Sequence, residues 1–289
     1  MISKYWQFMS ERMRYVEGLD PSEVRFHTFS FDGDTYWNYF HGYDKKFREN
    51  QWRALIKGVP AKYIISEPQP SFGYELDGRL FNRGTINCQQ TIKELWKTGI
   101  LSKLEAMNTP PQILEVGGGI GQIVYFLKQL LPRAKFVTID VPISLLFAKK
   151  YLGYHLGDRI KDVRFYDNEE WKTAGINTQF DLVMNIRSFQ EMTNKQVRDY
   201  VAFIREHLAG VFYSANGDGN PQNTEGDSVS KILAEHFDCT EVHIETGQAV
   251  ARNRLDRLLD LSPRKLYNRL ARKQDPKYVS HHCLCRIEV

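Results

Sequence analysis

Cysteine is scarce in this sequence, with four among 289 residues, which is too few for the disulfide framework of a small secreted protein. No apolar run approaches the roughly 18 residues that a membrane span needs. Residues 1–10 mix charges with aromatics, unlike a secretion signal. The net charge is only +4, without the basic stripe expected of a nucleic-acid-binding protein. These absences predict a cytoplasmic protein with no nucleic-acid partner.

The chain divides into two parts of different composition. Residues 1–104 form a helical part rich in aromatic side chains, ten of which fall in the range 26–52. We expect this part to act as a lid or substrate-binding segment. In residues 105–289, short apolar runs alternate with helical stretches, a pattern typical of parallel βαβ units. The expected strands span 112–116, 135–139, 163–166, 180–184, 210–214, 239–244 and 278–289, and the expected helices span 85–98, 122–131, 143–152 and 194–207.

The predicted fold is α/β, with a doubly wound, mostly parallel seven-stranded sheet. The last two strands follow the alternating block as a closing pair, which indicates an antiparallel C-terminal edge. Between them lies a basic helical stretch at 251–273. This stretch could touch an anionic membrane weakly, and a solvated helix that covers the closing strands is the alternative.

A glycine-rich turn is the clearest functional motif. Gly117, Gly119 and Gly121 lie between an expected strand and an expected helix. Glycine permits positive φ angles and lets the backbone approach a ligand closely, and amides at a helix start favour electron-rich groups. Nineteen residues after the last of these glycines, Asp140 ends the next strand, where a carboxylate can accept hydrogen bonds from both ribose hydroxyls. The motif predicts a nucleoside cofactor.

Three features favour S-adenosylmethionine over a dinucleotide. Gln122 stands where the dinucleotide fingerprint requires a third glycine. Glu115 adds a carboxylate that suits a cationic sulfonium and ammonium group better than a pyrophosphate. No Tyr-x-x-x-Lys follows the turn, so the usual catalytic pair of short-chain dehydrogenases is missing. The alternatives are a dinucleotide-dependent oxidoreductase and an α/β domain whose turn binds nothing.

Each cofactor contact can be assigned from its position along the chain. The three glycines would shape the loop around the methionine part, Glu115 would support the loop or the ammonium group, and Asp140 would hold the ribose. Asp167 follows the third strand and is either a partner of the adenine amino group or a solvated turn residue. Asn185 ends the fourth strand, and we expect it beside the transferring methyl group.

Three stretches of the chain resemble the sugar O-methyltransferase family encoded among polysaccharide-biosynthesis genes. They are Ser66-Glu67-Pro68 through Asn87, the glycine turn through Pro142, and Asn185 through Met192. Together they cover about residues 66–214, roughly half of the chain, and the family varies freely before residue 60. The resemblance implies a Rossmann-like class I methyltransferase that uses S-adenosylmethionine to methylate a hydroxyl of a glycan or nucleotide sugar.

The loop after the fourth strand lies at the carboxyl end of the sheet, where open α/β folds bind ligands. Glu191 is our first choice of general base, with helix capping as its alternative role. His27 and His41 are alternative bases, because histidine titrates near neutrality. Gln190 lies within reach of the acceptor. Arg187 could bind a phosphate or carboxylate on the acceptor, or form a surface ion pair.

Two further residues are candidates for sugar recognition. Asn87 could hydrogen-bond a hydroxyl group. Tyr36 belongs to the aromatic run, whose rings could lie against sugar C–H faces with their polar tips on hydroxyls. The alternative is that these rings pack the N-terminal helices onto the sheet.

No metal site is expected in the histidine- and cysteine-containing segment 281–285, because alternate strand residues face opposite sides of a sheet. No carboxylate cluster demands a divalent cation, and metal dependence stays open. Two other functions remain as alternatives: O- or N-methylation of a small molecule of secondary metabolism, and a non-catalytic cofactor-binding partner of a glycan enzyme. The sequence identifies neither the sugar and its hydroxyl nor the oligomeric state.

Overall fold

The computed structural model describes residues 4–28, 39, 42, 44–218, 228–241 and 279–286. Its α-helices are α1 (Lys4–Met13), α4 (Lys45–Ile56), α5 (Arg83–Lys97), α6 (Ile100–Glu105), α7 (Gln122–Leu130), α8 (Pro142–Leu156), α9 (Asn194–His207) and α10 (Val229–Ala234). Its strands are β1 (Tyr74–Leu76), β2 (Arg79–Phe81), β3 (Gln112–Val116), β4 (Lys135–Asp140), β5 (Val163–Asp167), β6 (Phe180–Ile186), β7 (Leu208–Asp218), β8 (Asp238–Glu241) and β9 (Val279–Arg286).

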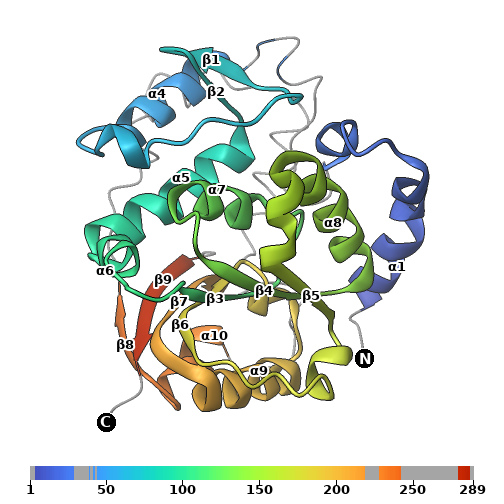
Figure 1. The fold of residues 1–289 in the computed structure, drawn as a ribbon, viewed down its shortest axis with the longest axis vertical. Helices are drawn as coiled ribbons and strands as arrows, with labels where there is room; N and C mark the ends of the chain where they lie inside the picture. The colour runs from blue at the N-terminus through green and yellow to red at the C-terminus, as the bar shows by residue number, and fades with distance from the viewer. Residues whose placement is uncertain are drawn as a thin grey trace, which may run out of the picture.

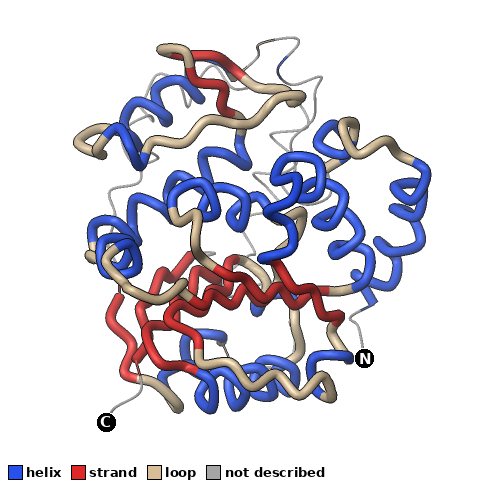
Figure 2. The backbone as a smooth tube through the Cα atoms, viewed as in Figure 1, coloured by secondary structure: helices blue, strands red, loops and turns tan. Residues whose placement is uncertain are grey.

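A seven-stranded sheet forms the centre of the molecule, in the order β5-β4-β3-β6-β7-β9-β8. Neighbouring strands from β5 to β7 pair in parallel, and β9 runs antiparallel to both of its neighbours. Figure 1 shows α5, α7 and α8 on one face of the sheet and α9 and α10 on the other. In Figure 2 the strands form one continuous band between these two helical layers. The predicted doubly wound, mostly parallel sheet is confirmed.

The strands form where apolar side chains follow one another without interruption, as expected when both faces of a sheet are covered. In β3, Ile113, Leu114 and Val116 are all fully buried. Alternate residues belong to different cores: Ile113 packs with the α5–α8 layer, and Leu114 and Val116 pack with the α9–α10 layer. Both layers are thus anchored on the strand that leads into the glycine turn.

The N-terminal part contains a hairpin that the sequence analysis did not predict. Strands β1 and β2 pair in antiparallel fashion through the two-residue turn Asp77-Gly78, and both turn residues have positive φ. Phe81 at the end of β2 stacks on the buried Trp52 of α4, with ring centroids 4.9 Å apart. These rings therefore have a packing role, which was the alternative interpretation for the aromatic run.

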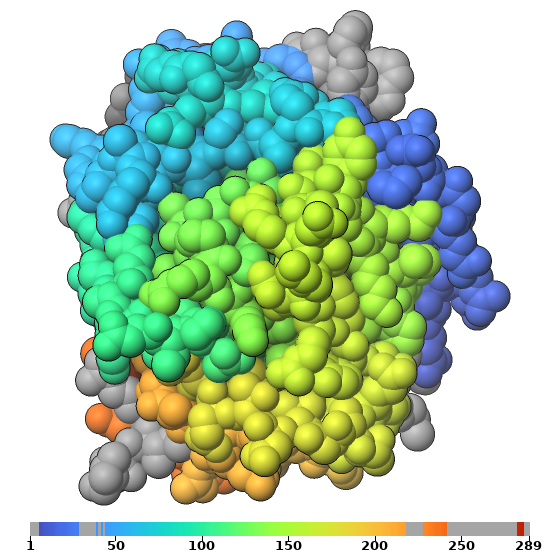
Figure 3. Space-filling model, in the orientation of Figure 1, coloured from blue at the N-terminus to red at the C-terminus, as the bar shows by residue number. Residues whose placement is uncertain are grey.

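Helix α5 begins two residues after Phe81 and carries the N-terminal part onto the sheet. Asn82 caps the helix by accepting from the Thr85 amide, and Thr85 completes a capping box. Ile92 and Leu95 of α5 are fully buried in the core on this face. Figure 3 shows the residues at the start of the chain packed closely against those of α8.

Two cysteines differ from the sequence-based expectation. Cys239 of β8 and Cys285 of β9 lie directly opposite each other, with Cα atoms 4.2 Å apart, and form a disulfide. The sequence analysis did not predict this bond, because the register that brings the two strands together could not be read from the sequence. None of the helices in the described ranges is long and apolar enough to cross a membrane.

Candidate functional site

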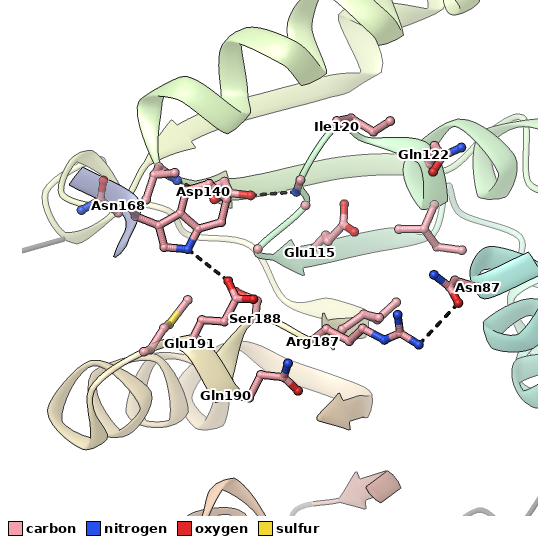
Figure 4. A pocket seen from close by; sticks show the side chains of 18 of the residues that line it. Asn87, Glu115, Ile120, Gln122, Asp140, Asn168, Arg187, Ser188, Gln190 and Glu191 are labelled. Atoms are coloured by element: carbon pink, nitrogen blue, oxygen red, sulfur yellow. Dashed lines mark hydrogen bonds between the residues drawn. The ribbon is translucent and has the colours of Figure 1, made fainter. Parts of the chain in front are cut away.

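A cavity of about 270 Å³ opens at the carboxyl ends of β3, β4 and β6. Its walls come from the glycine turn, the loop after β6, helix α5 and helix α1 (Figure 4). The residues that line it and carry the argument below are Trp6, Asn87, Glu115, Gly117, Gly119, Asp140, Asn168, Arg187, Ser188, Gln190 and Glu191. Among parallel α/β folds this edge of the sheet is the usual ligand site.

The glycine turn has the geometry that the sequence predicted for it. Gly117, Gly119 and Gly121 all have positive φ, at 80°, 54° and 82°. Gly117 also makes a close approach, because a Cβ there would overlap the side chain of Ser188. Its amide donates to the Ile139 carbonyl at 2.7 Å. A larger residue at position 117 would therefore force the turn and the loop after β6 apart.

Asp140 lies beside this turn, as expected for a ribose ligand. Its Oδ2 accepts from the Gly119 amide at 2.7 Å, and its Oδ1 accepts from the Val141 amide at 2.6 Å. Burial raises the pKa of Asp140 to about 6, and these two backbone hydrogen bonds oppose the rise. Each carboxylate oxygen keeps a second lone pair, so the side chain can hold the turn and still accept from a diol.

Glu115 is the residue that most clearly lacks a counter-charge. It is 3% exposed, and its Oε2 has no hydrogen-bond partner among the described residues. Burial raises the pKa of Glu115 to about 8, and the nearby charge of Asp140 adds to the rise. A buried, unsatisfied carboxylate next to a glycine turn fits a cationic group. The methionine ammonium and sulfonium of S-adenosylmethionine supply such charge.

Asp167 does not contribute to the cavity. Its Oδ1 accepts from the amides of Glu169 and Glu170, at 2.8 and 2.7 Å, which makes it a turn residue. The next residue, Asn168, lines the cavity beside Val141. Of the two roles that the sequence left open for Asp167, its contacts are those of a turn residue.

Asn185 is also placed differently from the prediction. It is fully buried and does not line the cavity. Its Nδ2 donates to the Val116 carbonyl at 2.8 Å, and its Oδ1 accepts from the Asn216 side chain at 2.8 Å. Because successive strand residues face opposite sides, it is the next residue, Ile186, that lines the cavity. Asn185 fixes the ends of β3, β6 and β7 relative to one another.

Arg187 and Asn87 were both predicted to bind substrate, and the structure brings them together. Arg187 Nη2 lies 3.4 Å from Asn87 Oδ1, and both residues line the cavity. The backbone of Arg187 has φ of 57°, and its amide donates to the Ala215 carbonyl at 2.8 Å. A left-handed conformation is uncommon for a residue with a Cβ, and such strain gathers at functional sites.

Gln190 and Glu191 occupy a short 3-10 helix, η6 (Phe189–Glu191), on the wall below the turn. Gln190 Oε1 accepts from the Gly217 amide at 2.7 Å, so this side chain braces β7. Burial raises the pKa of Glu191 to about 7; a hydrogen bond from Trp6 lowers it, and the charge of Asp140 raises it. The capping alternative for Glu191 is wrong, because Thr193 and Gln196 form the capping box of α9.

The two histidines predicted as alternative bases and the aromatic candidate Tyr36 are not found at the cavity in the described residues. His27 ends the 3-10 helix η2 (Val24–His27), packs against Tyr15 with ring centroids 5.5 Å apart, and does not line the cavity. His41, Tyr36 and the basic stretch 251–273 lie outside the described residues. In the parts of the chain that the structure describes, no three His, Cys, Asp or Glu side chains gather to hold a metal.

Trp6 is the main cavity residue that the sequence analysis missed. It lies on α1, lines the cavity, and donates its indole N–H to Glu191 Oε2 at 3.1 Å. No motif surrounds it, and 185 residues separate the two partners, so no local signal could have identified it. Ser188 also lines the cavity, and it belongs to the loop after β6 that the sequence analysis placed at the ligand-binding edge of the sheet.

The known proteins to which this chain is similar are methyltransferases that act on different substrates. No protein-family model matches it. A curated relative, the tRNA1(Val) (adenine(37)-N6)-methyltransferase of Flavobacteriaceae bacterium (strain 3519-10), is 31% identical over 126 residues. The match covers 42% of this chain and 52% of that protein, so the chain spans about half the length of this relative.

Solved structures with a similar fold include three methyltransferases of different substrate classes. An O-methyltransferase family protein from Burkholderia thailandensis is 9% identical, with 84% of this chain and 70% of that chain covered and a TM-score of 0.42. The CurJ carbon methyltransferase is 10% identical, with 86% of this chain and 69% of that chain covered and a TM-score of 0.47. Phosphoethanolamine N-methyltransferase 2 of Haemonchus contortus, in complex with S-adenosyl-L-methionine, is 13% identical, with 67% of this chain and 52% of that chain covered and a TM-score of 0.44. All three TM-scores are below 0.5, so the fold is assigned from this chain's own strand order and glycine turn, which are those of a Rossmann-like methyltransferase.

Proposed function

We propose that this protein transfers a methyl group from S-adenosylmethionine to a hydroxyl group of a sugar. The observation that carries the proposal is the composition of one cavity. The glycine turn, Asp140, the unsatisfied Glu115, Asn87, Arg187 and Glu191 all line it. In this proposal the first three form a cofactor half that holds a nucleoside with a positively charged tail, and the last three form an acceptor half that serves a polar acceptor.

In the cofactor half, each carboxylate has a distinct task. Asp140 is fixed by two backbone amides and accepts hydrogen bonds from the ribose hydroxyls. Glu115 becomes ionised when a cationic group enters, because the cation offsets the cost of burying its charge. When bound, S-adenosylmethionine supplies an electrophilic methyl carbon on a sulfonium.

In the acceptor half, Glu191 is the general base. S-adenosylmethionine would supply the methyl group to the acceptor oxygen and leave as S-adenosylhomocysteine, and the acceptor proton would pass to the Glu191 carboxylate. A base whose pKa is about 7 takes a proton efficiently at neutral pH and still releases it to solvent afterwards. Such a base favours a hydroxyl acceptor, which must lose its proton as it becomes an ether.

The sugar itself is inferred from the resemblance in residues 66–214 and from the polar acceptor wall. Asn87 and Arg187 present an amide and a guanidinium to the same space. Hydroxyl-rich ligands are bound by such planar donors and acceptors, and a guanidinium also suits a phosphate or carboxylate. A nucleotide sugar or an acidic glycan unit is therefore the class of acceptor to examine first.

A second candidate is methylation of an adenine amino group in RNA, which the activity of the curated relative suggests. A base flipped out of RNA needs aromatic side chains against which to stack. Trp6 and Tyr200 line the cavity and could serve in that way. This candidate places less demand on Glu191 as a base, because an amino nitrogen loses its proton readily once methylation has made it cationic.

The test has two stages. Calorimetric titration with S-adenosylhomocysteine, with NAD as the control, examines the cofactor. We expect binding of the first alone; binding of NAD alone would reject the proposal. Methyl transfer from labelled S-adenosylmethionine is then measured on a panel of nucleotide sugars, on acidic oligosaccharides and on unmodified tRNA. Incorporation into tRNA alone would replace the sugar by the second candidate.

A further inference from the structure

The indole of Trp6 is the only contribution of helix α1 to the cavity among the described residues. Its Nε1 donates to Glu191 Oε2 at 3.1 Å. In Figure 4 this hydrogen bond is the dashed line that ends at the carboxylate of Glu191. A residue near the start of the chain thus holds the side chain to which we assign the proton transfer.

Helix α1 is placed by contacts that do not involve the cavity. Trp6, Met9 and Met13 recur at helical spacing and pack against the core, and Met13 is 2% exposed. The chain then enters a 3-10 helix, η1 (Arg14–Gly18), whose Val16 is fully buried. Lys150 of α8 donates to the Leu19 carbonyl at 2.7 Å. The segment that follows α1 is therefore held on α8, and α1 leads directly into it, which limits where the indole can lie.

The hydrogen bond also orients the carboxylate of the base. Oε2 accepts from the indole and keeps a second lone pair, so either oxygen can still take a proton. The donated N–H stabilises the ionised carboxylate, while burial and the charge of Asp140 oppose ionisation. The other charged or titratable residues that line the cavity are Cys88, Glu115, Arg187 and Tyr200.

We propose that Trp6 is a positioning residue whose indole N–H fixes the Glu191 carboxylate for proton transfer, so that the base is complete only when α1 is docked. This inference rests on the proposed function. It adds that the first helix is part of the catalytic apparatus and that its removal disables proton transfer rather than cofactor binding.

The Trp6→Phe variant tests the inference, because phenylalanine keeps an aromatic ring and removes the N–H. We expect the acidic limb of the kcat/KM profile to move up by about half to one pH unit, the size expected from one hydrogen bond. The dissociation constant of S-adenosylhomocysteine should change by less than about twofold. In a Glu191→Gln background, Trp6→Phe should have little further effect on the rate, because the partner is already gone. Equal rate losses from Trp6→Phe in both backgrounds would show that Trp6 does not act through Glu191.

The matched control is Phe8→Leu, which changes an aromatic residue on the same helix that is 50% exposed. We expect it to leave the pH profile where it is in the unmodified protein. An acidic limb that shifts equally in both variants would overturn the inference, since general loosening of α1 would then be the cause.

A second readout does not depend on methyl transfer and so separates this inference from the proposed function. The Glu191 carboxyl is titrated by NMR in protein labelled with carbon-13 glutamate, with Glu191→Gln used for assignment. We expect its pKa to rise in Trp6→Phe, and an unchanged pKa in a variant that binds S-adenosylhomocysteine normally would reject the inference. If Trp6→Phe fails to fold, the indole N–H resonance of Trp6 is followed in the unmodified protein as the pH changes. The inference requires this resonance to shift with the same pKa as the Glu191 carboxyl, and a resonance that does not shift in this way would reject the inference.

Discussion

Arg25 and Glu67 form a buried ion pair, with Nε 2.7 Å from Oε1 and side chains 1% and 0% exposed. The same carboxylate accepts from Thr85 Oγ1 at 2.5 Å and from Gln122 Nε2 at 3.0 Å. Gln122 follows the last glycine of the turn and lines the cavity. The ion pair thus ties the N-terminal part to the first residue of α7, and through it to the cofactor half of the site.

Loss of Arg25 should unfold the protein more readily. Arg25→Met leaves a buried carboxylate without its cation, which costs about 3–5 kcal/mol. Urea denaturation followed by circular dichroism measures the free energy of unfolding. The control is Arg12→Met, because Arg12 lies on the solvent-exposed side of α1. A loss below about 1 kcal/mol, typical of surface ion pairs, would contradict the buried role.

Asp140→Asn should weaken cofactor binding. The amide keeps the shape of the side chain but removes the charge that strengthens its hydrogen bonds to the ribose. We expect the affinity for S-adenosylhomocysteine to fall by about 1.5–3 kcal/mol, or roughly ten- to hundredfold. Calorimetry measures the change, with Asp158→Asn in the exposed turn after α8 as the control. An unchanged dissociation constant would reject the ribose role.

Glu115 makes the stability of the cofactor-free protein depend on pH. Its pKa in the folded protein is about 8, above the value of 4.5 expected for an exposed glutamate. The folded state therefore binds the extra proton between these values, and this contribution to stability is present below about pH 4.5 and is lost as the pH rises through 8. Glu115→Gln should become progressively more stable than the unmodified protein over that range, by at most about 1.4 kcal/mol per pH unit.

Thermal or urea unfolding at pH 5 and pH 8 measures this difference between Glu115→Gln and the unmodified protein. Asp140 and Glu191 also have raised pKa values, but they remain in both proteins and cancel in the comparison. A constant difference across the pH range would mean that Glu115 stays ionised when buried. Its partner would then have to be a cation from outside the described residues.

The central sheet could be predicted because each strand carries its own signal. Runs such as Ile113–Val116 are short, apolar and followed by a helix, which is enough to identify parallel units. The hairpin of β1 and β2 was missed although Asp77-Gly78 is a strong two-residue turn signal, because strands of three residues give no periodicity. The pairing of Cys239 with Cys285 depends on the register of β8 and β9, which no local pattern encodes.

The place of the site could be predicted, while the direction of single side chains could not. Gly117 and Asp140 follow from spacing along the chain, and both line the cavity. Asn185 and Asp167 do not line it, because a change of one residue in a strand or turn reverses the direction of a side chain. Trp6 could not be found at all, because its role depends on how α1 docks against a loop far away in the sequence.

Arg187 offers a prediction that separates backbone strain from acceptor binding. Its φ of 57° is costly for any residue with a Cβ and is free of that cost for glycine. We therefore expect Arg187→Gly to be more stable than Arg187→Ala by about 1 kcal/mol. Both variants lose the guanidinium, so both should raise the KM for an anionic acceptor by roughly tenfold or more, the value of a charged hydrogen bond.

Urea unfolding and initial-rate kinetics on the same two variants examine the two effects independently. Neither variant should change the affinity for S-adenosylhomocysteine, because Arg187 lies on the acceptor wall with Asn87. Equal stabilities of the glycine and alanine variants would mean that the loop relaxes to a negative φ. An unchanged KM for phosphorylated and carboxylated acceptors alike would mean that the guanidinium serves only to hold Asn87, and a neutral sugar would then be the better acceptor.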